Sequence, residues 1–277
     1  MRTEPKKIIY DTSDTVPFYL WHYETNHLNK EMPIIYLHGG GFVSGDAQDL
    51  PESYIDIFLD VGHDFIAIEY PLAPEATLQK IIAHTIKAVN SFLEINSHYS
   101  SYILFGRSAG AYLALQVANR ISHKPKVLFL FYGYHTLVEA SFNVPNRHYL
   151  QYAKITTRTI EQIKKYTHPY KGNKEKRFAL YVHYRQTGTW IKDILHPSEQ
   201  PKTYSLVAEQ LQKLPPAFVV ASSGDPDVPF KISKKIATLI PNSHLETVDS
   251  KEHDFDRTPT PLALSIYNKM TAWEKQH

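Results

Sequence analysis

The sequence contains no cysteine, so disulfides cannot hold the fold together, and cysteine nucleophiles and thiolate metal sites are excluded. It also lacks an excess of charge of one sign. The 30 Lys and Arg side chains and the 28 Asp and Glu side chains leave a formal net charge of +2 at pH 7. Because this balance gives no bulk attraction for a polyanion, we expect no nucleic-acid partner.

Long hydrophobic runs are missing as well. Residues 1–30 carry mixed charges and no apolar stretch that resembles the core of a signal peptide. The printed sequence has no uninterrupted apolar segment long enough to span a bilayer. We therefore expect a cytoplasmic protein with no membrane span.

The apolar residues that are present, 43% of the chain, are enough for a sizeable core. Short β-rich apolar runs alternate with longer amphipathic stretches, which predicts an α/β fold with a mostly parallel eight-stranded sheet flanked by helices. Residues 34–37 and 127–131 are apolar on both faces, as central parallel strands are. The predicted strands are residues 7–10, 18–23, 34–37, 65–69, 102–105, 127–132, 217–221 and 244–248. Helices are predicted from Leu78 to about Leu93 and from Ser108 to about Asn119.

Residues 135–212 break this alternation and are rich in tyrosine and basic side chains. We interpret them as a mainly helical cap inserted into a core formed by residues 1–134 and 213–277. The cap's basic side chains, Arg177 among them, either favour an anionic substrate or form a solvated face. Its aromatic side chains either line a substrate pocket or form the cap's own core; they are Phe142, Tyr149, Tyr152, Tyr181, Tyr184 and Trp190.

The segment Gly106-Arg107-Ser108-Ala109-Gly110 stands between a predicted strand and a predicted helix. A serine nucleophile needs its hydroxyl raised above the sheet on a sharp turn, and such a turn closes only over minimal flanking side chains. This pattern makes Ser108 the candidate nucleophile. The alternative is an ordinary glycine-bounded turn.

Three consecutive glycines, Gly39 to Gly41, follow His38 at the end of the strand 34–37. Acyl transfer builds negative charge on a carbonyl oxygen, and backbone N–H groups stabilise it where no side chain intrudes. The glycines can supply such a loop or can be a flexible turn. Near the C-terminus, Asp225 and Asp227 follow the strand 217–221, where a carboxylate can orient a histidine or belong to a plain Asp-Pro turn.

Together these motifs resemble the α/β-hydrolase superfamily, and more narrowly the hormone-sensitive-lipase-like esterases and acetyl esterases. The oxyanion loop of that family matches residues 38–41, and its Gly-x-Ser-Ala-Gly elbow matches residues 106–110. Its stretch Asp-Tyr-Arg-Leu-Ala-Pro-Glu is similar to residues 69–75, to which we assign an architectural role. The family's order of serine, acid and histidine selects His253 among 15 histidines. Inside the elbow, Arg107 replaces the commoner acidic or histidine residue.

The resemblance implies a serine hydrolase that cleaves small or short-chain carboxylic esters through an acyl-enzyme. Ser108 would be the nucleophile, His253 the general base and Asp225 the triad acid, with Asp227 as the alternative acid. The oxyanion would be bound by backbone N–H groups; these belong to Gly40, Gly41 and Ala109. The resemblance implies no metal and no organic cofactor.

Two other functions remain open. One is a peptidase or amidase of the prolyl-peptidase type, which would cleave aminoacyl amides. The other is a non-catalytic ligand-binding protein on the same fold, a class that typically loses a member of the triad. The presence of Ser108, His253 and an acid in this chain disfavours the non-catalytic binding protein.

Overall fold

A computed structural model describes residues 4–13, 16–28, 30–166 and 174–277 of the chain. Within these ranges eight strands form one sheet in the order β1-β2-β4-β3-β5-β6-β7-β8. Their bounds are β1 Lys6–Asp11, β2 Phe18–Tyr23, β3 Ile34–Leu37, β4 Phe65–Ile68, β5 Ile103–Arg107, β6 Val127–Phe131, β7 Ala217–Ser222 and β8 His244–Val248. Every predicted strand is confirmed, and its bounds differ from the prediction by two residues at most.

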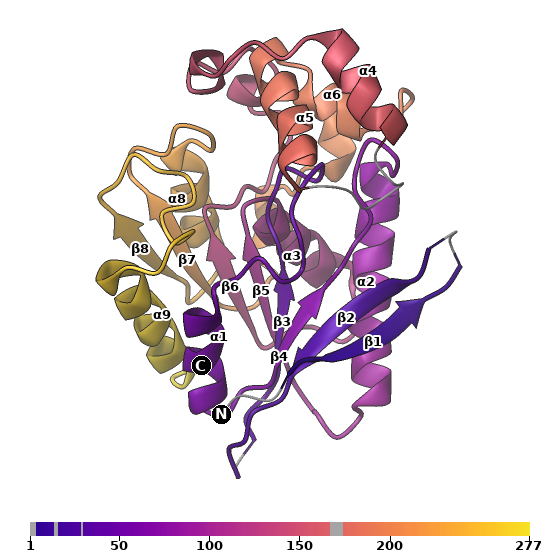
Figure 1. The fold of residues 1–277 in the computed structure, drawn as a ribbon. Helices are drawn as coiled ribbons and strands as arrows, with labels where there is room; N and C mark the ends of the chain where they lie inside the picture. The colour runs from indigo at the N-terminus through magenta and orange to yellow at the C-terminus, as the bar shows by residue number, and fades with distance from the viewer. Residues whose placement is uncertain (1–3, 14–15, 29, 167–173) are drawn as a thin grey trace.

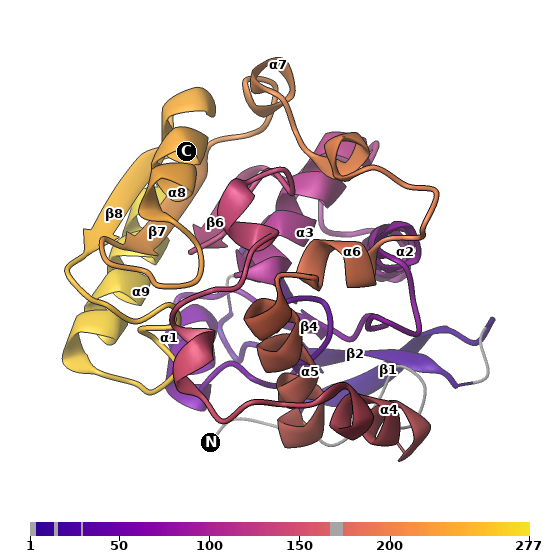
Figure 2. The ribbon, with the colours of Figure 1, turned by 90° about the horizontal axis from the view of Figure 1, so that it is seen from above.

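The sheet is parallel from β4 to β8, and β1 and β2 extend it as an antiparallel edge. The central strand β3 pairs with β4 on one side and β5 on the other, and all four of its residues are buried. Seen from above, β1 and β2 lie at one edge of the molecule and β8 at the other (Figure 2). The carboxyl ends of the parallel strands therefore share one edge, where ligands bind in open α/β sheets.

Helices cover both faces of the sheet (Figure 1). One face carries α2 (Leu78–Ile95), α3 (Ala109–Arg120) and α8 (Phe230–Leu239), and the other carries α1 (Glu52–Asp60) and α9 (Pro261–Glu274). The predicted helices correspond to α2 and α3, although Ser108 precedes α3 and is not inside it. Thr77 caps α2 by accepting a bond from the N–H of Lys80, as helix N-termini require.

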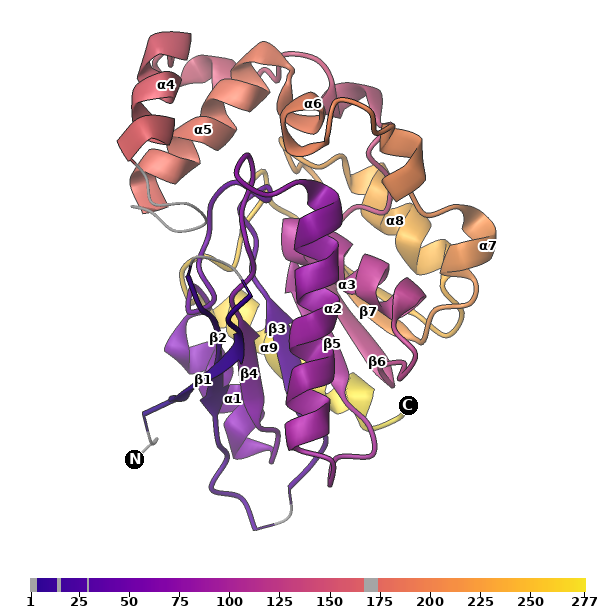
Figure 3. The same cartoon turned by 90° about the vertical axis from the view of Figure 1, so that its right-hand side faces the viewer.

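Residues 135–212, which we predicted to form a cap, are mainly helical in their described part. Their helices are α4 Thr157–Tyr166, α5 Lys174–Thr187, α6 Trp190–Ile194 and α7 Ala208–Leu211. Helices α4, α5 and α6 lie above the carboxyl ends of the strands, and α7 lies beside α8 (Figures 1 and 3). Two short 3-10 turns, η1 Ala140–Phe142 and η2 Tyr149–Gln151, precede α4, and a third, η3 Pro201–Tyr204, lies between α6 and α7. These observations confirm the predicted α/β fold with a mostly parallel eight-stranded sheet flanked by helices. In the described part of the chain, no helix has the length and apolar character to cross a membrane.

Candidate active site

Ser108 occupies a sharp turn between β5 and α3, with φ 52° and ψ −117°. A positive φ is disfavoured for a residue with a side chain, so the surrounding structure must hold this conformation in place. A Cβ atom on Gly106 would stand 2.2 Å from the carbonyl oxygen of Gly110. A Cβ on Gly110 would stand 2.0 Å from the carbonyl oxygen of Leu37. The two flanking glycines are thus required for the turn to close.

The structure brings Ser108, His253 and Asp225 together from three different strand ends. Ser108 Oγ lies 2.8 Å from Nε2 of His253, and Nδ1 of the same ring lies 2.7 Å from Oδ2 of Asp225. Because the carboxylate accepts from Nδ1, the neutral imidazole leaves Nε2 free to accept from the serine hydroxyl. This arrangement can take a proton from Ser108 when its oxygen attacks an electrophile.

Asp225 is fixed by the backbone of its own loop. Its side chain is 1% exposed, and its Oδ1 accepts hydrogen bonds from the N–H groups of Asp227 and Val228, at 2.8 and 2.9 Å. One carboxylate oxygen is thereby held by the loop, and the other faces His253. These bonds fix the orientation of the carboxylate toward the imidazole.

The charge state of His253 depends on this carboxylate. Burial by itself lowers the pKa of His253, but the charge of Asp225 and its hydrogen bond outweigh burial and raise the pKa to about 9. The charges of Asp227 and Asp254 act in the same direction. The groups that stabilise the imidazolium, which forms when His253 takes the proton of Ser108, are therefore already in place before a substrate binds.

The glycine loop lies beside the nucleophile, because a Cβ on Gly39 would stand 3.3 Å from Cβ of Ser108. The carbonyl of Gly39 accepts a bond from Nδ1 of His38 at 2.7 Å. The carbonyl of Gly40 accepts bonds from the N–H groups of Val43 and Ser44, at 3.1 and 3.0 Å. In a trans peptide the next N–H points away from the carbonyl. The bound carbonyls therefore turn the N–H groups of Gly40 and Gly41 to the opposite side of the loop.

Ala109, the third predicted oxyanion donor, is the first residue of α3. The first N–H groups of a helix have no partner inside the helix and carry the positive end of its dipole. Gly40, Gly41 and Ser108 all line one cleft of about 750 Å³ under the cap. The predicted oxyanion residues and the predicted nucleophile are therefore neighbours in the structure.

The alternative acid, Asp227, faces the cap. Its Oδ1 lies 2.9 Å from Nη2 of Arg185, and its Oδ2 accepts bonds from the hydroxyls of Tyr149 and Tyr181, at 2.9 and 2.7 Å. Burial raises the pKa of Asp227, but Arg185 and these partners outweigh burial and keep the pKa below its usual value. Asp227 is a charged anchor of the cap, while Asp225 contacts the imidazole.

The predicted pocket-lining aromatics divide into two groups. Tyr149, Tyr152 and Tyr181 line the cleft, whereas Phe142, Tyr184 and Trp190 do not line it and are packed in the core. Phe178, which we had not predicted as a lining residue, lines it as well. The stretch 69–75 has the architectural role expected of it, since Glu75 receives two bonds from Arg177 of the cap.

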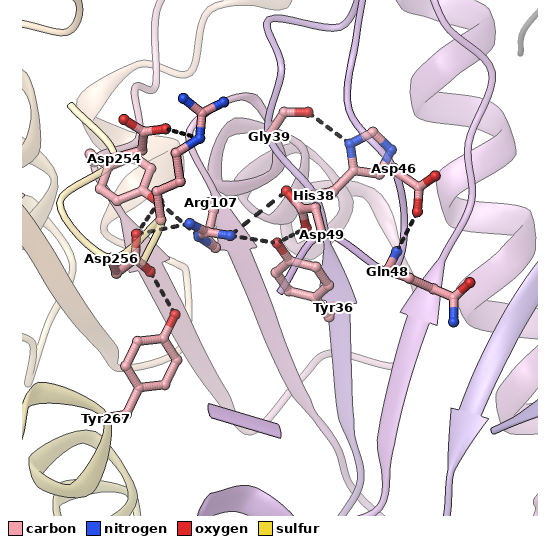
Figure 4. A network of polar contacts seen from close by, with 12 residues as sticks. Tyr36, His38, Gly39, Asp46, Gln48, Asp49, Arg107, Asp254, Asp256 and Tyr267 are labelled. Atoms are coloured by element: carbon pink, nitrogen blue, oxygen red, sulfur yellow. Dashed lines mark hydrogen bonds and ion pairs between the residues drawn. The ribbon is translucent and has the colours of Figure 1, made fainter. Parts of the chain in front are cut away.

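Sequence reasoning missed a buried ionic network behind the nucleophile, centred on Arg107 and Asp256 (Figure 4). The signal was the arginine itself: an ionisable side chain at the end of an apolar strand must have a buried partner. The partner cannot be identified from the sequence, because it lies 149 residues further along the chain. Among the described residues, no group of three or more His, Asp or Glu side chains has the arrangement of a metal site.

The family model of the alpha/beta hydrolase fold matches residues 34–232 of this chain. The chain belongs to the alpha/beta hydrolase family. Two solved structures are similar to this hydrolase over nearly their whole length. A Staphylococcus aureus protein with unknown function is 31% identical with a TM-score of 0.86, covering 98% of both chains. An alpha/beta hydrolase superfamily protein from Enterococcus faecalis is 30% identical with a TM-score of 0.84, covering 94% of this chain and 96% of its own.

More distant relatives carry names with an activity. An esterase from Rhizomucor miehei shares the fold of this hydrolase, with a TM-score of 0.67 at 20% identity, over 99% of this chain and 82% of its own. Kynurenine formamidase of Danio rerio is 30% identical over 113 residues, which is 38% of this chain. That match spans 37% of the formamidase. A non-reducing polyketide synthase of Penicillium rubens is 25% identical over 136 residues, which is 43% of this chain and 5% of the synthase.

Proposed function

We propose that this chain is a carboxylic-ester hydrolase that uses Ser108, His253 and Asp225 as its catalytic triad. The observation that carries the proposal is the hydrogen-bonded relay from Ser108 Oγ through the imidazole to Asp225, with distances of 2.8 and 2.7 Å. It is supported by the strained backbone of Ser108 and by the glycine loop beside it. Among known proteins with the same fold, the Rhizomucor miehei esterase points to ester substrates.

In the first step, Oγ of Ser108 attacks the carbonyl carbon of the ester while Nε2 of His253 takes the hydroxyl proton. The π electron pair of the carbonyl moves onto its oxygen, and backbone N–H groups of Gly40, Gly41 and Ala109 bind the resulting oxyanion. Asp225 stabilises the imidazolium and keeps Nε2 directed at the reacting atoms.

The tetrahedral intermediate then collapses. The bond to the alcohol oxygen breaks, and His253 returns its proton to that oxygen, so that a neutral alcohol leaves and an acyl ester remains on Ser108. Water attacks the acyl-enzyme with His253 again as the base. A second collapse releases the carboxylic acid and restores the hydroxyl of Ser108, so no cofactor is needed to balance the reaction.

A small or short acyl group suits the space beside the oxyanion loop. The ring of Tyr181 lies so close to Gly41 that a Cβ there would be 2.3 Å from a ring carbon. Trp190 donates its indole N–H to the carbonyl of Gly41 at 2.9 Å and packs against Phe42 and Phe142. This filled volume favours esters whose acyl chain is short.

An amide substrate is the second candidate, because kynurenine formamidase matches part of the chain. The same residues would act, with His253 protonating a leaving amine in place of an alcohol. The difference between the two candidates is therefore one of substrate and not of machinery.

The test compares p-nitrophenyl esters from acetate to long acyl chains with aminoacyl anilides and an N-formyl anilide, each assayed with the wild type and with Ser108→Ala. We expect Ser108-dependent turnover that is fastest with the short esters. Faster Ser108-dependent cleavage of the anilides would establish the amidase instead. A folded wild type that turns over none of them contradicts both candidates and favours a binding protein.

A further inference from the structure

The residue immediately before the nucleophile, Arg107, directs its side chain into the protein. It is 5% exposed and forms an ion pair with Asp256, which is fully buried, at 2.9 Å from Nη2 to Oδ1. Its Nε donates to the hydroxyl of Tyr132 at 2.7 Å, and its Nη1 donates to the hydroxyl of Tyr36 at 3.4 Å. Figure 4 shows the guanidinium between Asp256 on one side and Tyr36 with Asp49 on the other.

Asp256 is held from several directions at once. Besides Arg107, the hydroxyl of Tyr132 donates to its Oδ1 at 2.7 Å, and the hydroxyl of Tyr267 donates to its Oδ2 at 2.6 Å. Removing two charges from water costs several kcal/mol per ion, so apolar side chains of similar size would stabilise a core as well or better. A network of this kind therefore contributes a defined geometry more than it contributes stability.

That geometry includes the general base, because Asp256 follows His253 by three residues. The intervening Phe255 stacks on Phe131 of β6 and contacts the ring of Tyr132. The ring of Tyr132 also lies under the imidazole, with 4.7 Å between the centroids. Arg107, the residue next to the nucleophile, is thus linked through Asp256 and Tyr132 to the loop and the ring that place His253.

Tyr132 itself has a strained backbone, with a φ of 40° at the end of β6. A tyrosine adopts this region only where its surroundings enforce it, and such strain gathers at functional sites. Its N–H donates to the carbonyl of Val220 at 2.6 Å, and its hydroxyl is fixed between Arg107 and Asp256. The backbone and the hydroxyl of Tyr132 are therefore both fixed by hydrogen bonds, which fixes the orientation of the ring between them.

We propose that Arg107, Asp256 and Tyr132 are positioning residues that hold the imidazole of His253 at hydrogen-bonding distance from Ser108. The role rests on the proposed function, because it concerns the base of that reaction. His253 lies in the loop between β8 and α9. The beginning of this loop is held separately, by a hydrogen bond from the N–H of Gly224 to the carbonyl of Ser250 at 2.9 Å. The network supplies the second attachment, so that the loop cannot move the imidazole away from the nucleophile.

Tyr132→Phe is the most informative variant, because it keeps the ring under the imidazole and removes only the hydroxyl between Arg107 and Asp256. Tyr102→Phe is the matched control: it also removes a buried tyrosine hydroxyl, one that donates to the carbonyl of His123 at 2.8 Å. Because small displacements of a catalytic group cost up to about 10²-fold in rate, we expect Tyr132→Phe to lower kcat by about 10-fold or more with KM unchanged. Tyr102→Phe should keep the kcat of the wild type.

Asp256→Asn is the stronger perturbation, but it removes the buried partner of Arg107, leaves only Asp49 at 3.7 Å, and can prevent folding. Tyr267→Phe gives an independent measurement, since it removes a different bond to Asp256 and is expected to lower kcat in the same direction. The rate at which a fluorophosphonate labels Ser108 should fall in parallel, because that reaction also needs the base in place.

The outcomes separate this inference from the function on which it rests. If the wild type hydrolyses esters and both tyrosine variants match Tyr102→Phe in kcat and labelling rate, the network is only structural and the inference is wrong. If the wild type neither hydrolyses esters nor reacts with the fluorophosphonate, the proposed function fails, and the positioning role falls with it.

Discussion

Asp225 and Asp227 are two residues apart in one loop and face opposite directions. Asp225 contacts the imidazole, and Asp227 pairs with Arg185 of the cap. The N–H of Asp227 also donates to Oδ1 of Asp225, so the two carboxylates share one turn. A sequence pattern places both at the end of β7, but it cannot give the direction of either side chain, which depends on partners far along the chain.

The two carboxylates should therefore respond differently to the same substitution. Asp225→Asn is expected to lower kcat by about 10⁴-fold, because the amide stabilises the wrong imidazole tautomer. Asp227→Asn should mainly lower the free energy of unfolding, by about 3–5 kcal/mol, since it leaves Arg185 as an unpaired buried charge. Ester kinetics and denaturant unfolding of both variants measure the two effects. A larger loss of kcat in Asp227→Asn than in Asp225→Asn, in folded protein, would transfer the acid role.

The raised pKa of His253 predicts the pH dependence of the reaction. The base acts in its neutral form, and Asp225 raises the pKa of the imidazole to about 9 although burial opposes it. Below that pH, kcat/KM should increase about tenfold per pH unit, and above it the rate should level off. In Asp225→Asn the pKa should fall toward the ordinary value of about 6.5, which moves the rise in rate to lower pH. A wild-type profile that is already flat from pH 6 upward would contradict this account.

At the scale of single residues, the motif residues were predictable because chemistry restricts them to few residue types. Ser108 and its glycines could be found since no other side chains fit that turn. Asp256 could not be identified from the sequence, because nothing in the residues around it indicates that its partner is a buried arginine.

At the scale of elements, α5 connects the two halves of the candidate site. Arg177, near its beginning, donates to the carbonyls of Val43 and Ala73, both at 2.8 Å, on the side of the glycine loop. Arg185, near its end, pairs with Asp227 in the acid loop. Both arginines are buried, so the alternative of a solvated face does not hold for Arg177. They are eight residues apart, which places them on one face of the helix, directed at the core.

Replacing either arginine should weaken the attachment of the cap to the core and lower the free energy of unfolding. Arg185→Met leaves Asp227 buried without its cation, and we expect the free energy of unfolding to fall by about 3–5 kcal/mol. Lys192→Met, an exposed basic residue of the cap, is the matched control and should change it by less than about 0.5 kcal/mol. Denaturant unfolding measures both variants. Equal stability of the two would show that α5 is not held by its ion pair.

The parallel strands were the most predictable elements. Apolar runs such as β3 are short and buried on both sides, so their bounds follow directly from the sequence. No bounds were predicted for helices α1, α8 and α9, although α9 begins with Thr260 as its cap and Pro261 in the first turn. The cap was predicted as helical, but its attachment to the core depends on long-range charge pairs that no periodicity reveals.

At the scale of the whole molecule, the fold brings four loops to one edge of the sheet. The glycine loop follows β3, the nucleophile follows β5, the acid follows β7 and the histidine follows β8. Because these strands are parallel, their carboxyl ends meet, and the cap covers the place where they meet (Figures 1 and 3). Order along the chain was therefore enough to predict this assembly, while the shape of the cleft required the structure.

The most direct test of the central claim is covalent labelling of the wild type by a fluorophosphonate, followed by intact-mass and peptide mass spectrometry. A serine with its base in place reacts with this reagent at the hydroxyl, displaces fluoride and keeps the phosphonyl group. We predict one adduct per chain, located on Ser108, with loss of ester turnover in proportion to labelling. Ser108→Ala should gain no adduct and remain folded. A folded wild type that stays unlabelled, or an adduct on another residue with Ser108 unmodified, would contradict the assignment of Ser108 as the nucleophile.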